Sequence, residues 1–270
     1  MTICLVLAVS LGVSPVQTVI QTTPAVLPST PPPLEEIVER LVEHAQKDIL
    51  LRRSYLIYTK VFTVEDLRRP LGQQVIKQEQ SLVIGKDGKA YQRKIVENGV
   101  PLNPPVEERI YIEVDEILTS GRYVLSMAEP PETTIDGRRY WQLAFRPKNN
   151  LPDPDQDESL KDIPDSEKDK YKAFNALVGI IKVDAERYFI RRLDGHLEKD
   201  KKVGPGGPFG ALFEFNITAL HQEVSMNAGP GIIVPESIVI SFYIRKFFNR
   251  TRERHTLIYG TFLPAKPPQE

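Results

Sequence analysis

The segment LFEFNITALHQEV, residues Leu212–Val224, carries the pattern that decides the fold of this chain. Apolar and polar side chains take turns in the order Phe213, Glu214, Phe215, Asn216, Ile217 and Thr218. Because successive side chains of a β-strand point to opposite faces, this alternation predicts a strand with one apolar and one polar face. Similar runs recur from Tyr55 to Phe262, so we expect a large antiparallel β-sheet.

Turn sequences between these runs predict hairpins. The expected strand pairs are Val75–Ile84 with the strand that holds Tyr91, Arg93 and Ile95, Arg122–Met127 with Tyr140–Arg146, Ala176–Val183 with Tyr188–Leu197, and Ile232–Phe248 with Arg252–Phe262. A further strand is expected at Tyr55–Val64. Residues 101–105, with three prolines, are expected to interrupt the sheet, and Glu107–Leu118 fits either a helix or a strand.

Two of the predicted strands have one apolar face each. Trp141, Leu143 and Phe145 share one face of their strand. In Val75–Ile84 the apolar and polar sets lie opposite each other, as Ile76, Leu82 and Ile84 against Lys77, Glu79 and Ser81. The alternation predicts that the apolar set lies on the dry face.

One amphipathic helix is expected to begin at Leu34, directly after Pro33. Its apolar residues recur at steps of three and four: Leu34, Ile37, Val38, Leu41, Val42, Ala45 and Ile49. This spacing predicts a single apolar stripe, with acidic residues on the opposite face. Proline suits the first helical position, and the glutamates suit the positive end of the helix dipole.

The N-terminus predicts export. Ile3–Val13 is an apolar run with the length of a signal-peptide core, shorter than the roughly 20 residues that cross a bilayer. No basic residue precedes it, which leaves a disordered N-terminus of a cytosolic protein as the alternative. Cys4, the single cysteine, lies within this run, so the mature chain would contain no disulfide and no thiolate metal site.

The chain is therefore expected to contain one folded domain. We predict a signal peptide over residues 1–20, a Pro-rich tether over 21–33, a single domain over 34–263 and a disordered tail over 264–270. Within the domain, an acidic loop is expected at 150–170 and a Gly-rich loop at 203–210. Eight acidic residues against two lysines between Asp153 and Asp169 favour a flexible, self-repelling loop over a calcium site, since the glycine and bidentate glutamate of an EF-hand are missing.

Composition and motifs argue against enzymatic function. The formal net charge of −1 gives no global attraction for nucleic acid. The four histidines (His44, His196, His221 and His255) have no ligand spacing and are expected at ordinary surface positions. No Gly-x-Ser-x-Gly motif is present, and Gly204–Gly210 fails the dinucleotide pattern. We expect no catalytic residue, no metal and no cofactor.

A basic turn near the C-terminus is a candidate contact site for a membrane or a partner. It comprises Arg245, Lys246, Phe247, Phe248, Arg250 and Arg252. Such a turn, with two aromatic residues, suits anionic headgroups or an acidic partner. The alternative is a charged hairpin end that keeps edge strands soluble.

The order of these features resembles the LolA/LolB-like outer-membrane lipoprotein-sorting superfamily. The resembling parts are the helix from Leu34 and the runs YTKVFTVEDLRRPLGQQVIKQEQSLVIGKDGKAYQRKIVENGVPL, RRYWQLAFRPK, LVGIIKVDAERYFIRRLDGHL and IIVPESIVISFYIRKFFNRTRERHTLIYGTF. The resemblance implies a mainly-β α+β fold, an unclosed half-barrel whose concave face receives acyl chains, with helices as a lid. In the receptor protein of this superfamily, a protruding apolar loop is associated with membrane insertion. The nearest candidate for such a loop in this chain is Gly204–Leu212.

Together the patterns and the resemblance predict a periplasmic, non-enzymatic carrier for lipid or a lipidated partner, with the N-terminal helix packed on the concave face. The expected ligand-lining residues are Trp141, Leu143, Phe145, Phe213 and Phe215. The alternative is a scaffold or protein-interaction module of the cell envelope, with the same fold and a filled core. In that case the same aromatic residues are simply part of the core.

Overall fold

A computed structural model describes residues 31–110, 113–114, 118, 121–198, 211–225, 231–246 and 249–264 of the chain. Several predictions concern residues outside these ranges. They are the signal peptide over 1–20, residues 21–30 of the tether, the Gly-rich loop 203–210, residues 265–270 of the tail, and Phe247 and Phe248 of the basic turn.

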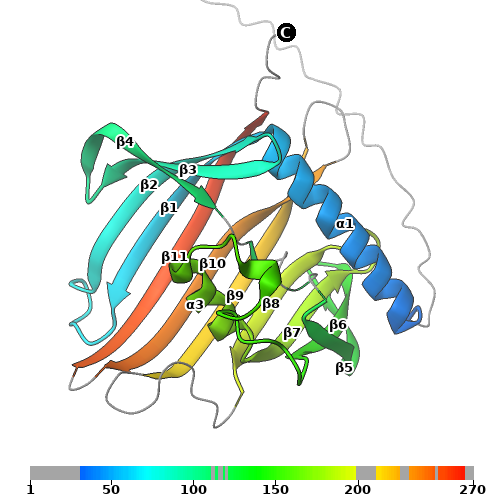
Figure 1. The fold of residues 1–270 in the computed structure, drawn as a ribbon. Helices are drawn as coiled ribbons and strands as arrows, with labels where there is room; N and C mark the ends of the chain where they lie inside the picture. Colours follow the sequence, from blue (N-terminus) through cyan, green and yellow to red (C-terminus); the bar gives the residue numbers. More distant parts are fainter. Residues whose placement is uncertain are drawn as a thin grey trace, which may run out of the picture. The chain divides into compact units, whose positions relative to one another are not determined.

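The described residues form one eleven-stranded antiparallel sheet (Figure 1). Its strands are β1 (Leu56–Asp66), β2 (Val75–Lys86), β3 (Lys89–Glu97), β4 (Val100–Ile110), β5 (Tyr123–Ile135), β6 (Arg138–Pro147), β7 (Leu177–Asp184), β8 (Ile190–Leu197), β9 (Ala211–Val224), β10 (Ile232–Lys246) and β11 (Asn249–Pro264). They lie in the order β4-β3-β2-β1-β11-β10-β9-β8-β7-β6-β5. The four predicted hairpins are confirmed, and the prediction of a mainly-β, unclosed antiparallel sheet is confirmed with them.

The two edges of the sheet are β4 and β5, and both contain prolines. The prediction that residues 101–105 interrupt the sheet is wrong, because β4 runs through them and pairs with β3 on either side of an irregularity between Lys94 and Val96. A similar irregularity separates Met127 and Glu132 on β5. An edge strand has only one neighbour, so prolines without an N–H are tolerated there and discourage further pairing.

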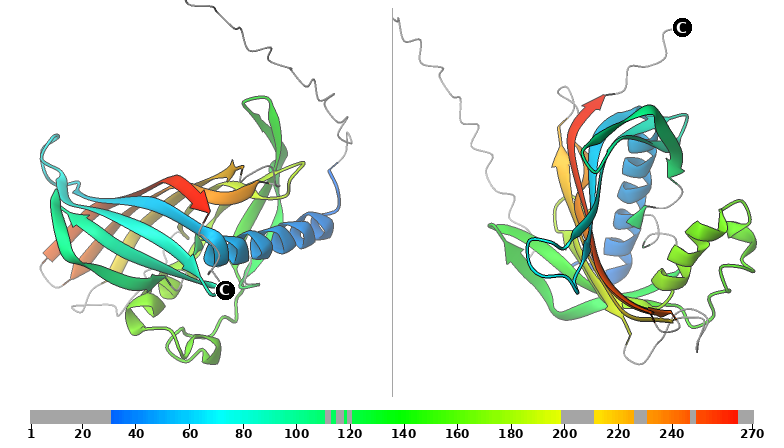
Figure 2. Two further views of the ribbon diagram at one scale, coloured as in Figure 1. Left: turned by 90° about the horizontal axis from the view of Figure 1, so that it is seen from above. Right: turned by 90° about the vertical axis from the view of Figure 1, so that its left-hand side faces the viewer.

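The predicted amphipathic helix is confirmed as α1 (Leu34–Tyr55). It crosses the concave side of the sheet (Figure 2), and Ile37, Leu41, Ala45 and Ile49 of its stripe are buried. Its last residue is Tyr55, although the alternation predicted that the first strand begins there. The helix approaches the sheet closely at Gly85 of β2, where the Cβ atom of any other residue would stand 2.0 Å from the carbonyl oxygen of Arg52.

The structure reverses the faces predicted for β2. Glu79 and Ser81 are only 4% and 1% exposed, whereas Ile76 is 38% exposed. The register with β1, which places Glu79 opposite Phe62, turns the polar set toward the concave side. The side chains of Lys77 and Lys94 compensate the charge of Glu79 there.

The acidic stretch is not a loop throughout, so this prediction is wrong for part of it. It contains a 3-10 turn, η1 (Glu158–Leu160), and the start of α3 (Asp165–Phe174). Lysine and arginine side chains from outside the stretch relieve the expected repulsion. Asp157 lies 2.8 Å from Arg122 Nη1, and Asp155 lies 2.9 Å from Lys172 Nζ. These partners were too distant in sequence, or too isolated, to be recognised from the charge pattern.

Candidate functional site

The register of the central strands creates an apolar floor on the concave face. Across β1, β11 and β10, Phe62 lies opposite Leu257, and Leu257 lies opposite Ile238. Together with Tyr58, Ile240 and Tyr259, which lie on the same faces of these strands, they form the floor of a cavity of about 380 Å³. This is toward the small end of the roughly 300–1,000 Å³ typical of ligand sites.

Two further segments form walls of this cavity. Lys170 and Phe174 come from α3, and Ile110, Glu113 and Val114 come from the end of β4 and the residues after it. Figure 2 shows α3 on the same side of the sheet as α1. The cavity is therefore bounded by segments that are far apart in sequence.

Lys60 is the basic residue within the apolar floor. It follows Tyr58 and precedes Phe62 on the same face of β1, and its Nζ donates a hydrogen bond to Gln92 Oε1 on β3. Gln92 Nε2 in turn donates to Ser81 Oγ at 3.1 Å. Burial lowers the pKa of Lys60 from 10.5 to about 8, and the positive charge of Lys170 acts in the same direction. Lys60 thus remains largely protonated at neutral pH, at a cost in desolvation.

A buried acid lies beside Lys60. Glu79 forms ion pairs with Lys77 at 2.7 Å and with Lys94 at 2.6 Å. Burial alone would raise the pKa of Glu79, but the two lysines hold the pKa below its usual value. Its charge is therefore already compensated by two cations. The sequence pattern gives no sign that Lys60 and Glu79 face inward, because single charged residues in an alternating strand normally face water.

Two histidines lie inward, contrary to the predicted surface positions. The ring of His255 lies edge-on between Phe62 and Phe242, with centroid distances of 5.4 and 4.8 Å, and its Nε2 is 2.8 Å from Glu253 Oε2. His221 is buried, and both histidines line the cavity. They fill places in the concave face that apolar residues take on the neighbouring strands.

An ion-pair cluster fixes the end of α1 to one wall of the cavity. Arg52 is 2% exposed, donates from Nη1 to the carbonyl of Ile233 at 2.8 Å, and lies 2.6 Å from Glu113 Oε2. Arg53 Nε lies 3.0 Å from the other carboxylate oxygen of Glu113. The cluster joins α1, β10 and the segment after β4.

The predicted ligand-lining residues do not line this cavity. Trp141, Leu143 and Phe145 are buried together in the half of the sheet formed by β5 to β8. The ring of Tyr123 contacts Phe145 edge-on at 5.4 Å, and its hydroxyl donates to the carbonyl of Phe174 at 2.7 Å, which ties the end of α3 to this half.

The two other predicted lining residues lie on β9. Phe213 packs against Tyr243 with ring centroids 5.7 Å apart, and Phe215 pairs with Phe242 of β10. The half of the concave face over β5 to β8 is filled by the protein's own side chains. The cavity occupies the half over β1, β10 and β11. Ligand contact by the five predicted residues stays a prediction.

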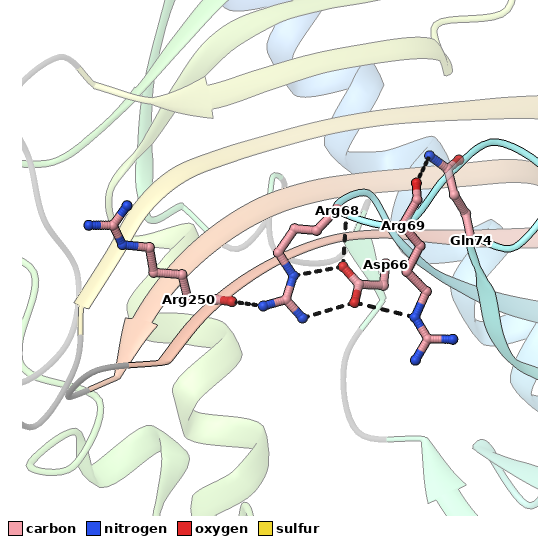
Figure 3. A network of polar contacts seen from close by, with 5 residues as sticks. All are labelled: Asp66, Arg68, Arg69, Gln74 and Arg250. Carbon is pink, nitrogen blue, oxygen red and sulfur yellow. Dashed lines mark hydrogen bonds and ion pairs between the residues drawn. The ribbon is translucent and has the colours of Figure 1, made fainter.

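The predicted basic turn lies at one end of β10 and β11, where Arg245 pairs with Arg250, Lys246 with Asn249 and Tyr243 with Arg252. The turn between β1 and β2 lies next to it (Figure 3).

In that neighbouring turn, Arg68 donates to the carbonyl of Arg250 and forms an ion pair of 2.8 Å with Asp66, which also lies 3.6 Å from Arg69. The hydrogen bond from Arg68 is the main reason that the pKa of Asp66 falls from 3.8 to about 2. We call Arg68, Arg69, Arg245, Arg250 and Arg252, all of them exposed, the basic rim.

Two other kinds of feature are absent among the described residues. Within the described part of the chain, no three histidine, cysteine, aspartate or glutamate residues are grouped so that they could hold a metal ion. Helices in that part are also too short or too polar to cross a bilayer.

No family model and no curated protein sequence matches this chain. Similar solved structures include a domain described as an outer membrane lipoprotein-sorting protein from Vibrio parahaemolyticus, with 9% identity and a TM-score of 0.45 over 86% of this chain and 95% of that one. A LolA superfamily protein from Nitrosomonas europaea and a DUF1329 family protein from Desulfovibrio piger each have 11% identity and a TM-score of 0.40, over 87% of this chain and 94% of theirs. The superfamily that the sequence resembles is thus among the structural matches.

Proposed function

We propose that this protein is a non-enzymatic binding protein that holds a lipid, or the acyl part of a lipidated partner, in the cavity on its concave face. The observation that carries the proposal is the cavity of about 380 Å³ on an apolar floor. Removing apolar ligand surface from water would supply the affinity, at about 25 cal/mol per Å² before the costs of ordering.

The proposed setting is the bacterial periplasm. The apolar run Ile3–Val13 supports export, although it lies outside the described residues. The basic rim supports a peripheral contact with anionic headgroups or with an acidic envelope protein. Leu71, in the turn that also carries Arg68 and Arg69, is 91% exposed and would add an apolar contact at the same place.

A second function is favoured by the filled half of the concave face. Trp141 and Leu143 are 1% and 0% exposed, as in an ordinary core. A scaffold or protein-interaction module of the cell envelope would need no ligand in the remaining cavity. The two functions differ in one measurable property, which is the uptake of lipid.

Native mass spectrometry tests the proposal directly. Gently purified protein should carry a lipid, or should take one up from a lipid extract. The variant Leu257→Trp places a large side chain on the cavity floor, and we expect it to reduce uptake at least about tenfold. Ile258→Trp is the matched control, because Ile258 is the next residue of β11 and points to the exposed convex face.

Uptake by the wild type and by Ile258→Trp, with loss in Leu257→Trp, would support the carrier function. A wild-type protein that is free of lipid and takes up none from the extract would refute it and leave the scaffold function. Equal uptake by all three proteins would place any bound lipid outside this cavity.

A further inference from the structure

The cavity floor contains a cation whose charge no carboxylate neutralises at short range. Within the described residues, no carboxylate oxygen lies within 4.0 Å of Lys60 Nζ, and its one hydrogen-bond partner there is the neutral amide of Gln92. The ammonium group has three donors. An ammonium group in an apolar setting is costly unless it is paired, so this position calls for an anion.

The neighbouring acids are not available to meet this need. Glu79, the acid that raises the pKa of Lys60 more than Glu108 does, is itself paired with Lys77 and Lys94. Glu108 also lines the cavity, but it lies on the edge strand β4 and is exposed to solvent. Glu167 pairs with Lys170 at 2.6 Å. The cation in the floor is therefore left for a group that enters the cavity.

The surroundings of Lys60 fix the kind of ligand. Tyr58 and Phe62 flank it on β1, and Tyr259 lies opposite it on β11, so an ammonium group and an apolar surface are presented together. Gln92 adds an amide that can donate as well as accept. At about 380 Å³ the cavity suits a small amphiphile with one chain.

We infer that the cavity selects a single-chain lipid with an anionic head, carboxylate or phosphate, whose charge pairs with Lys60 while the chain lies on the aromatic and aliphatic floor. This inference rests on the proposed lipid-binding function. It adds the chemistry of the head group and the residue that recognises it.

The first test compares three ligands of equal chain length on the wild-type protein. Dodecanoate, dodecyl phosphate and neutral dodecanol would be titrated by isothermal calorimetry at pH 7. Since hydrogen bonds to charged groups are among the stronger ones, we expect the anions to bind about ten- to a hundredfold more tightly than the alcohol. A tighter carboxylate would identify a fatty acid as the source of the anion, and a tighter phosphate would identify a phospholipid fragment.

The second test uses Lys60→Met, which keeps an unbranched side chain and removes the charge. We expect this variant to lose the preference for both anions over dodecanol. Lys86→Met is the matched control, since Lys86 is an exposed lysine at the end of β2. It should keep the preference.

The third test uses pH. Because Lys60 carries its charge below about pH 8, affinity for dodecanoate should fall as the pH rises through 8 in the wild type and stay level in Lys60→Met. The other charged groups about Lys60 are Glu79, Lys94, Glu108 and Lys170, and the cavity is also lined by Arg109, Glu113, Glu167, His221 and His255. The variant separates Lys60 from all of these.

The outcomes distinguish the inference from the function on which it rests. Equal binding of alcohol and anions by the wild type, or an unchanged preference in Lys60→Met, would overturn the inference and leave lipid binding intact. If none of the three amphiphiles bound and the lipid extract also gave no uptake, the proposed function itself would fail.

Discussion

Replacing Arg52 by methionine should destabilise the fold strongly, because this buried arginine joins three parts of it. The change removes the hydrogen bond to the Ile233 carbonyl and the ion pair with Glu113. A buried carbonyl left without a donor costs about 1–3 kcal/mol. Removing one partner of a buried ion pair costs about 3–5 kcal/mol when the remaining charge is uncompensated.

The second cost should not apply in full. Arg53 stays 3.0 Å from Glu113 and continues to compensate its charge. We therefore expect Arg52→Met to lower the free energy of unfolding by about 2–4 kcal/mol. Arg53→Met is the matched control, and because Arg53 is partly exposed it should cost about 1 kcal/mol or less.

Urea unfolding would measure both effects. Trp141 is the single tryptophan of the chain and is buried, so its fluorescence should report unfolding of the sheet. Linear extrapolation gives the free energy in water. A loss under about 1 kcal/mol in Arg52→Met, or equal losses in the two variants, would refute the assignment of Arg52 as the residue that joins α1 to β10.

Three further predictions concern particular contacts. Gly85→Ala should lower the free energy of unfolding by about 1–3 kcal/mol in the same urea titration, because its Cβ would lie 2.0 Å from the carbonyl oxygen of Arg52. The control Gly260→Ala, whose Cβ would lie 3.6 Å from its nearest neighbour, should lower it much less. Because the pKa of Asp66 is lowered to about 2, its ion pairs stabilise the fold above about pH 4, and this stability is lost as the pH falls toward 2. Asp66→Asn should therefore remove this part of the pH dependence of the free energy of unfolding. In sedimentation with anionic vesicles, joint replacement of Arg245 and Arg250 by glutamine should weaken binding roughly thirtyfold, at about 1 kcal/mol for each charge, and unchanged binding would argue against the basic rim as a membrane contact.

Local sequence patterns predicted the type and order of most secondary structure elements, with β4 and α3 as the exceptions. Alternation identified the strands, the three- and four-residue spacing identified α1, and turns such as Asn98-Gly99 and Asp136-Gly137 lie where positive φ angles are observed. These features depend on residues close together in the chain, so short-range rules are sufficient to find them.

The acidic stretch and β4 show where short-range rules fail. The charge pattern of Asp153–Asp169 predicted repulsion, yet Arg122, more than thirty residues away from Asp157, supplies a countercharge. The prolines of β4 predicted a break, but the strand lies at the edge of the sheet, where they do no harm. Both predictions failed because they depended on the folded chain. Folding brings Arg122 to Asp157 and places β4 at the edge of the sheet.

The sequence by itself determined a mainly-β chain with one amphipathic helix and no recognisable catalytic motif. Only the tertiary structure decided that Glu79 and Lys60 face inward, that Trp141 and its neighbours form a filled half, and that the cavity lies over β1, β10 and β11. The physical reason is that alternation divides a strand into two faces, whereas the register between strands and the path of α1 decide which face is covered.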